Sequence, residues 1–223
     1  MSNDKPKVRA ALFDMDRTLI RKETASLYMR YQRDIGRANS WDLLKTFYWV
    51  GKYTFGVLDA DKLADNVLSS MRGVSEPAFV RECEDWFAKY VETHIAEKGR
   101  EAVAKHRAQG DVCAIVTGAT RYAAGPLAQR LEIEHVVASE LEIDDTGQFT
   151  GRAVKPLCLG NGKLQRAEAL ANRLGFVLQE ATFYTDSISD LPLLERVAEP
   201  IVINPDPRLL RVAKRRGWPI ERW

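Results

Sequence analysis

The feature that most constrains the fold of this chain is a series of five short apolar runs, separated mostly by longer stretches in which apolar residues have helical spacing. The runs do not alternate strictly between apolar and polar residues, which is typical of strands covered on both faces. Strands that alternate with helices along a chain form a parallel sheet of the α/β class. We therefore expect such a sheet, with strands at residues 8–14, 111–117, 135–139, 181–186 and 200–204.

The interval between the first two predicted strands is too long for a simple crossover. Residues 21–98 have the apolar spacing of about four helices and contain no convincing strand, whereas a crossover between parallel strands needs only about a dozen residues. We interpret the interval as an inserted all-helical cap. The predicted domains are an α/β core formed by residues 1–20 and 99–223 and a cap formed by residues 21–98.

A second departure from the alternation of strands and helices lies at residues 139–154. Two extended arms meet there at Asp145, Thr146 and Gly147, which together are a turn signal. We expect a β-hairpin that lies outside the main sheet.

Charge and composition exclude several classes of partner. The chain has 33 Lys and Arg residues and 31 Asp and Glu residues, so its formal net charge of +2 gives no reason to expect nucleic acid. The most aromatic segment, residues 41–57, is interrupted by charged residues, whereas a membrane span needs about 20 mainly apolar residues. The first residues contain no secretory signal, and the three cysteines lack the spacing of disulfide or zinc sites. We expect a cytoplasmic protein without membrane or nucleic-acid partners.

Polar side chains follow the predicted strands where the strands end. In open α/β sheets, ligands bind in the crevice beyond the carboxyl ends of the strands. A lysine also lies at the predicted start of the helix after the hairpin. The residues gathered at this edge are Asp14, Asp16 and Thr18 after the first strand, Thr117 and Gly118 after the second, Asp186 and Asp190 after the fourth, and Lys163.

The acids in this set favour a metal ion. Because side chains two apart on an extended chain share a side, Asp14 and Asp16 can face one pocket while Met15 points away. Acids this close repel each other unless a cation lies among them. Ligands that are all oxygen atoms favour Mg²⁺, and the predicted metal site comprises Asp14, Asp16, Asp186 and Asp190. Each motif alone is also explained by a turn or a helix cap, but their joint occurrence at strand ends favours chemistry.

Taken in chain order, these residues form four motifs, which are Asp14-x-Asp16-x-Thr18, Thr117, Lys163 and Asp186-Ser-Ile-Ser-Asp190. The set resembles the motifs of the haloacid dehalogenase superfamily of phosphohydrolases, and the phosphoserine phosphatase branch is the closest match. The resemblance implies a Rossmann-like parallel sheet with an inserted helical cap. It also implies a Mg²⁺-dependent phosphatase that acts on a small phosphomonoester.

The resemblance assigns roles to the acids. Asp14 would attack phosphorus and form an aspartyl phosphate, while Asp16 would protonate the leaving oxygen and later activate water. Mg²⁺ would be held by the carboxylates of Asp14 and Asp186 and by the backbone carbonyl of Asp16. Asp190 would support the ion through water.

The remaining core residues would bind the phosphoryl group or shape its surroundings. Lys163, the Thr117 hydroxyl and backbone N–H groups near Gly118 would stabilise the charge on the phosphoryl oxygens. Thr18 would orient the loop after the first strand.

The cap should determine which substrate is used. Glu23, nine residues after Asp14, resembles a glutamate that binds the substrate ammonium in phosphoserine phosphatases, although an acid in the first turn of a helix is an equally good explanation. Those enzymes also have a cap arginine for the substrate carboxylate; Asn66 takes that place here, and Arg72 is the nearest candidate. Histidinol phosphate, an amino-alcohol phosphate without a carboxylate, would fit this pattern. Its ring could stack on aromatic side chains that are otherwise the core of the cap, which are Trp41, Phe47, Tyr48, Trp49, Tyr53 and Phe55.

Two further functions remain open from the sequence. An alcohol could intercept the aspartyl phosphate, which would make the protein a phosphotransferase, or the chain could bind a phosphorylated ligand without catalysis. A phosphotransferase would pass phosphate to added alcohols, whereas a binding protein would release none from an aryl phosphate. In each case the expected partner is a small phosphorylated metabolite, and the expected state is a monomer or a homodimer.

Overall fold

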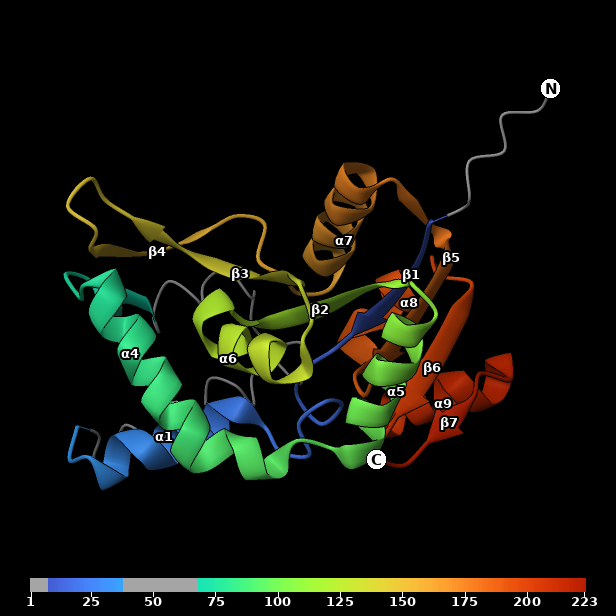
Figure 1. The fold of residues 1–223 in the computed structure, drawn as a ribbon, viewed down its shortest axis with the longest axis horizontal. Coiled ribbons are helices and arrows are strands. Elements are labelled where there is room, and N and C mark those ends of the chain that lie inside the picture. Colours follow the sequence, from blue (N-terminus) through green and yellow to red (C-terminus); the bar gives the residue numbers. More distant parts are fainter. Residues whose placement is uncertain (1–7, 38–67) are drawn as a thin grey trace.

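The centre of the molecule is a seven-stranded sheet (Figure 1) in a computed structural model that describes residues 8–37 and 68–223. Its strands are β1 (Val8–Phe13), β2 (Val112–Thr120), β3 (His135–Ile143), β4 (Phe149–Val154), β5 (Phe176–Thr185), β6 (Glu199–Ile203) and β7 (Ile220–Glu221). Their order is β4-β3-β2-β1-β5-β6-β7, and every neighbouring pair is parallel except β3 and β4. The predicted parallel α/β sheet is therefore confirmed.

Helices cover both faces of the sheet. The α-helices are α1 (Thr24–Asp34), α4 (Glu76–Trp86), α5 (Glu97–Ala108), α6 (Arg121–Leu131), α7 (Asn161–Leu174), α8 (Leu191–Leu194) and α9 (Pro207–Arg216), and shorter helical turns lie at Ser69–Met71, Phe87–Val91, Glu92–His94 and Ile188–Asp190. Side chains alternate along β1, so Ala10 and Leu12 pack under α7, α8 and α9, while Ala11 and Phe13 pack under α5 and α6. The runs lack strict alternation because both faces are buried.

The sheet grows in two directions from β1. The neighbours of this strand are β2 on one side and β5 on the other. Where connections diverge in this way, the carboxyl ends of the two adjacent strands leave a crevice for ligands. The segments that follow β1 and β5 carry Asp14 and Asp186, so the topology places both acids at that crevice.

The hairpin predicted at residues 139–154 exists, but the prediction that it lies outside the main sheet is wrong. Its first arm is the second half of β3, whose first half pairs with β2, and β4 pairs with that arm as the edge strand. Because β3 extends beyond β2, its backbone groups need another partner, which β4 supplies. The turn lies where it was predicted, and Asp144 Oδ1 accepts a hydrogen bond from the Thr146 N–H at 2.8 Å.

The described part of the predicted cap is helical. Figure 1 shows α1 and α4 at one end of the molecule, where one end of α4 lies near the β3–β4 hairpin. Phe79 and Cys83 of α4 form a buried cluster with Tyr122 of α6 and Phe149 of β4, so this end has a small apolar core of its own. Asn66 and the aromatic side chains discussed above lie outside the described residues. The division into core and cap stays a prediction.

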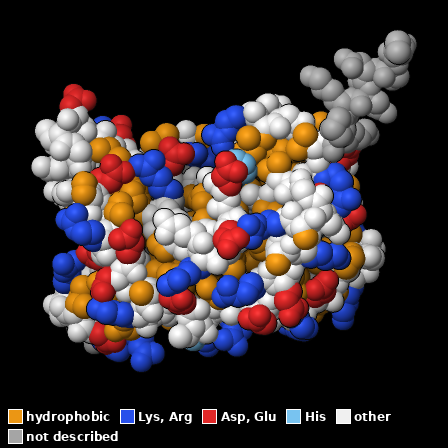
Figure 2. Space-filling model, viewed as in Figure 1, with side chains coloured by type: hydrophobic (Ala, Val, Ile, Leu, Met, Phe, Trp, Pro, Cys, Tyr) orange, Lys and Arg blue, Asp and Glu red, His pale blue; other side chains and the backbone are white. Residues whose placement is uncertain are grey.

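The surface carries charges of both signs. Figure 2 shows acidic and basic side chains interspersed over one face, with apolar side chains between them. On this face the nearly balanced charge of the chain is therefore spread out, rather than gathered into one basic or acidic patch. Among the helices of residues 8–37 and 68–223, none combines the length and the apolar character needed to cross a membrane.

The cysteines provide a test of burial. Cys83, Cys113 and Cys158 are free and buried. Burial raises the pKa of Cys83 and Cys158 to about 12 and that of Cys113 to about 11, so almost no thiolate exists at pH 8. We expect a thiol reagent such as DTNB to modify the native protein about 10²-fold more slowly than the denatured protein. Rapid labelling of any of the three thiols before unfolding would contradict this expectation.

Candidate active site

Asp14 lies at the point where β1 ends. Its backbone N–H donates to the carbonyl of Tyr184 on β5 at 2.8 Å, so this residue is still tied to the neighbouring strand. The side chain of Asp14 is buried, and Met15 belongs to the apolar core under α5 and α6. The two neighbours therefore point in opposite directions, as their spacing predicted.

Lys163 connects two of the predicted acids. It lies in the first turn of α7 and is only 2% exposed, and its Nζ is 2.8 Å from Oδ1 of Asp14 and 2.7 Å from Oδ2 of Asp190. Burial disfavours the ammonium, but the two carboxylates outweigh burial and raise the pKa of Lys163 above its ordinary value. The structure thus brings together three residues that are far apart in the sequence.

Two glycines allow the segment before α7 to approach the sheet. A Cβ on Gly118 would lie 2.4 Å from Cδ2 of Leu159, and a Cβ on Gly162 would lie 2.0 Å from the backbone oxygen of Leu157. At Gly162 the contact is with backbone, so a side chain does not fit, whereas at Gly118 the end of the Leu159 side chain would have to move. Gly118 lies within β2, so packing against Leu159, rather than a turn, is the constraint at this position.

We expect Gly162→Ala to displace the start of α7, because a methyl group does not fit so close to a backbone oxygen. The required shift should cost about 1–3 kcal/mol and lower the Tm measured by thermal unfolding. Gly125→Ala in α6 is the matched control, since a Cβ there would meet no atom within 4 Å. An unchanged Tm for Gly162→Ala would show that the backbone relaxes without cost.

Asp186 and Asp190 lie in the segment that follows β5. Asp190 Oδ2 accepts a hydrogen bond from Thr185 Oγ1 at 2.6 Å in addition to that from Lys163, whereas its buried Oδ1 has no partner among the described residues. Burial, and next the charge of Asp14, raise the pKa of Asp186 to about 9. This carboxyl group therefore lies where added positive charge would stabilise its ionised form.

The charges of the site fit an additional cation. Asp14, Asp186 and Asp190 are buried, and Lys163 is a buried cation that pairs with the first and the last of them. Burial raises the pKa of Asp14 to about 7 although Lys163 opposes the shift. The excess of acid and the unpartnered oxygen of Asp190 suit a small divalent cation with oxygen ligands. Within the described residues no three His, Cys, Asp or Glu side chains are grouped as metal ligands, so such an ion would need backbone, water or phosphate oxygens as well.

Asp16 faces the start of the cap. Its Oδ1 accepts a hydrogen bond from the backbone N–H of Thr24, the first residue of α1, at 2.7 Å. Burial raises the pKa of Asp16 to about 6, and the hydrogen bonds with Thr24 oppose this rise. A carboxyl group whose pKa lies near neutrality can both donate and accept a proton.

The two predicted hydroxyl groups are both buried. Thr117 Oγ1 accepts a hydrogen bond from the N–H of Ala119 at 3.2 Å, which leaves the hydroxyl proton to be donated. Thr18 Oγ1 has no hydrogen-bond partner in the described part of the chain. The orienting role predicted for Thr18 therefore has no hydrogen bond to support it.

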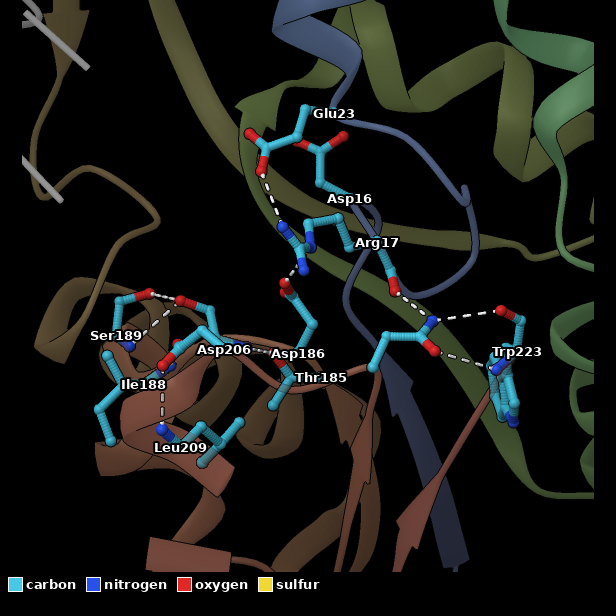
Figure 3. A network of polar contacts seen from close by, with 12 residues as sticks. Asp16, Arg17, Glu23, Thr185, Asp186, Ile188, Ser189, Asp206, Leu209 and Trp223 are labelled. Carbon is cyan, nitrogen blue, oxygen red and sulfur yellow. Dashed lines mark hydrogen bonds and ion pairs between the residues drawn. The ribbon is translucent and has the colours of Figure 1, made fainter. Parts of the chain in front are cut away.

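The two candidate substrate-binding residues of the cap lie in different places. Glu23 is exposed at the start of α1, and Figure 3 shows it beside Asp16. Arg72 is also exposed. Its Cβ lies close to Gly151 on β4, since a Cβ added at that glycine would be only 3.3 Å away. The structure thus brings Glu23 to the edge of the site and places the Cβ of Arg72 close to the hairpin.

Arg17 lies within the first acidic motif and was not predicted as a residue of the site. Its Nε is 3.1 Å from Oδ2 of Asp186, and its Nη1 is 3.8 Å from Oε1 of Glu23 (Figure 3). A basic residue directly after Asp16, within the Asp14-x-Asp16-x-Thr18 motif, was the visible signal. Thr24 and Thr185, which donate hydrogen bonds to acids of the site, belong to no motif, and only the fold reveals them.

Comparisons with known proteins give a consistent class. The model of the haloacid dehalogenase-like hydrolase family matches residues 11–195. The chain is 29% identical over 216 residues to the histidinol-phosphatase of Neisseria meningitidis serogroup C (strain 8013), which covers 94% of this chain and 96% of that one. It is 30% identical over 218 residues to phosphoserine phosphatase SerB1 of Mycobacterium tuberculosis (strain ATCC 25618 / H37Rv), which covers 95% of this chain and 70% of that one. A solved phospho-aspartyl intermediate analogue of phosphoserine phosphatase has a TM-score of 0.70 at 19% identity and covers 96% of this chain and 92% of that one.

The fold, the buried acids and these comparisons place the protein among the phosphatases. Because the family model spans most of its length, the chain belongs to the haloacid dehalogenase-like hydrolase family. The resemblance inferred from the four motifs is therefore confirmed, and so is the α/β fold class.

Proposed function

We propose that this protein is a Mg²⁺-dependent phosphatase that hydrolyses a small phosphomonoester through an aspartyl phosphate on Asp14. The observation that carries the proposal is the buried Asp14 carboxylate, whose Oδ1 is held by Lys163. We assign the attack to its other oxygen, Oδ2. A bond forms between Oδ2 and phosphorus while the bond from phosphorus to the leaving alcohol breaks, and water then releases inorganic phosphate. A covalent intermediate replaces one difficult displacement by two easier ones.

Asp16 is the acid and base of the proposed reaction. Its proton goes to the leaving oxygen in the first step, and its carboxylate takes a proton from the attacking water in the second. Positioned proton transfer of this kind contributes about 10²- to 10⁴-fold in rate. The hydrogen bond from the Thr24 N–H to Oδ1 fixes the orientation of the group and supports this assignment.

The carboxylates of Asp14 and Asp186 and the backbone carbonyl of Asp16 would hold the divalent cation, with Asp190 behind them. When bound, Mg²⁺ would neutralise charge on the phosphoryl oxygens. The excess of buried acid described above supports this assignment.

The phosphoryl group needs further donors from the chain. Lys163 supplies a buried ammonium within reach of Asp14, and Thr117, which lies within β2, supplies a hydroxyl proton. Backbone N–H groups near Gly118 complete the proposed set, while Thr18 lies within the loop that carries the acids. Donors fixed by the fold stabilise developing charge without having to reorganise.

The substrate would be a small phosphorylated metabolite with an amino group. Glu23 lies at the edge of the site, where it could bind an ammonium group. Phosphoserine remains the first candidate, with Arg72 as the predicted partner of its carboxylate. Histidinol phosphate is the second candidate, because Asn66 stands where phosphoserine phosphatases have the cap arginine and this substrate has no carboxylate to bind. The proposal includes a cytoplasmic location, which the three free thiols support.

A substrate panel tests the proposal. Release of inorganic phosphate should be measured with phosphoserine, histidinol phosphate and an aryl phosphate, in Mg²⁺ and again after treatment with EDTA. We expect release in Mg²⁺, a loss of at least about 10²-fold with EDTA, and different kcat/KM values for the two amino substrates. No release from any of them would leave phospholigand binding as the function. Transfer to added alcohols would indicate a phosphotransferase.

A further inference from the structure

The turn that joins β6 to α9 contacts both loops that carry the acids. Asn204 follows β6, and its Nδ2 donates to the backbone carbonyl of Arg17 at 3.0 Å. The same amide bonds the last residue of the chain, since Nδ2 lies 3.3 Å from the carbonyl of Trp223 and Oδ1 accepts from the Trp223 N–H at 3.2 Å (Figure 3). The loop after β1 is therefore tied to the far end of the chain through one side chain.

Asp206, two residues later, holds the other loop. Its N–H donates to the carbonyl of Asp186 at 2.9 Å, and its Oδ2 accepts from the N–H of Ile188 at 2.6 Å. Its Oδ1 accepts from the N–H groups of Arg208 and Leu209 and so caps α9. One carboxylate thus divides its oxygens between the acidic loop and a helix that packs on the sheet.

These bonds oppose a tendency of the two loops to separate. Asp14 and Asp186 are acids on neighbouring loops, and their ionised forms repel each other. Arg17 spans the same gap with its ion pair to Asp186. Its φ of 54° is one that residues with a side chain rarely adopt, so the loop needs an anchor to keep this conformation. The hydrogen bond from Asn204 supplies that anchor.

We propose that the turn at residues 204–206 is a positioning element that sets the spacing between the loop of Asp14 and Asp16 and the loop of Asp186. Asn204 and Asp206 contact neither substrate nor cation in this scheme. They act through backbone atoms of Arg17, Asp186 and Ile188. The inference rests on the proposed function, because the spacing matters through the cation that both loops would hold.

Isosteric variants test the role of the turn. Asn204→Asp keeps the size and the acceptor of the side chain but loses the N–H donor to Arg17. Asn204→Gly removes the side chain without adding charge, and glycine adopts the φ of 42° found at this position without strain. Asp206→Asn keeps one oxygen to cap α9 but presents an amide donor to the N–H of Ile188. The matched control is Leu209→Ala, which weakens the packing of α9 through a buried side chain and leaves the bonds to both loops in place.

The readout is the Kd for Mg²⁺ measured by isothermal titration calorimetry without substrate, together with Tm and with kcat as a function of Mg²⁺ concentration. We expect the three turn variants to bind Mg²⁺ at least about 10-fold more weakly and to recover most of their kcat at high Mg²⁺. Leu209→Ala should lower Tm while its Kd stays within about twofold of the original.

Two results would overturn the positioning role while leaving the proposed function intact. One is a Kd within about twofold of the original in all three turn variants. The other is equal weakening of Mg²⁺ binding in Leu209→Ala, which would show that the effect follows stability alone. If the unchanged protein binds no Mg²⁺, the metal-dependent function and this inference both fail.

Discussion

Asp14→Asn is expected to lower kcat for phosphate release by on the order of 10⁴-fold or more, while the protein keeps its fold. An amide oxygen is a poor nucleophile, so the first step of the proposed reaction cannot occur. The amide has the size of the carboxylate, and Lys163 can still donate to its oxygen. Burial raises the pKa of Asp14 to about 7, which shows that its ionised form is costly in the folded protein. The neutral amide avoids this cost, so the substitution should not destabilise the fold.

The kinetic loss should be compared with the Tm and the circular dichroism spectrum of the same variant, both of which should change little. Asp145→Asn removes an exposed charge at the tip of the hairpin and is the matched control. If Asp14→Asn kept more than about a tenth of the original kcat, Asp14 would not be the nucleophile.

Lys163→Met is expected to damage both stability and activity. The change leaves Asp14 and Asp190 without the ammonium that lies within 2.8 Å of each. Removal of one member of a buried ion pair costs about 3–5 kcal/mol, and loss of a donor to the phosphoryl group should lower kcat by about 10²- to 10³-fold. Urea unfolding and phosphate release measure the two effects, and Lys105→Met on the exposed face of α5 is the control.

The stability loss of Lys163→Met should depend on pH in the presence of EDTA. Lys163 opposes the rise in the pKa of Asp14, so its removal should raise the pKa of Asp14 in the folded state further. Groups with a raised pKa stabilise the fold while they are protonated, and this contribution is lost as the pH rises through the folded pKa. The variant should therefore be closer to the original protein at pH 5 than at pH 8. A deficit that is larger at pH 5 would contradict the assigned ion pairs.

The strands from β1 to β6 and the edge of the sheet that holds the site were predictable because they depend on local pattern, whereas β7 was not predicted. The run that ends at Asp14 shows the spacing of a strand covered on both faces, and neighbouring side chains on an extended chain point to opposite sides. The same reasoning placed Lys163 near the start of a helix. The prediction for the hairpin was wrong in one respect, because β4 joins the main sheet through β3. Whether β3 continues past the end of β2 depends on the relative lengths of these two strands, which local pattern does not give.

The amino-acid sequence by itself determined the class of fold, the chain order of the motifs and the chemical types of the groups at the strand ends. Only the tertiary structure decided that Lys163 pairs with both Asp14 and Asp190, that Arg17 reaches Asp186, and that Asn204 holds the loop of Arg17. The physical reason is the difference between closeness along the sequence and closeness in space. Periodicity and turn preference act between residues close in sequence, whereas hydrogen bonds and ion pairs require atoms within a few ångströms, and the separation between Lys163 and Asp14 of 149 positions is overcome only by packing.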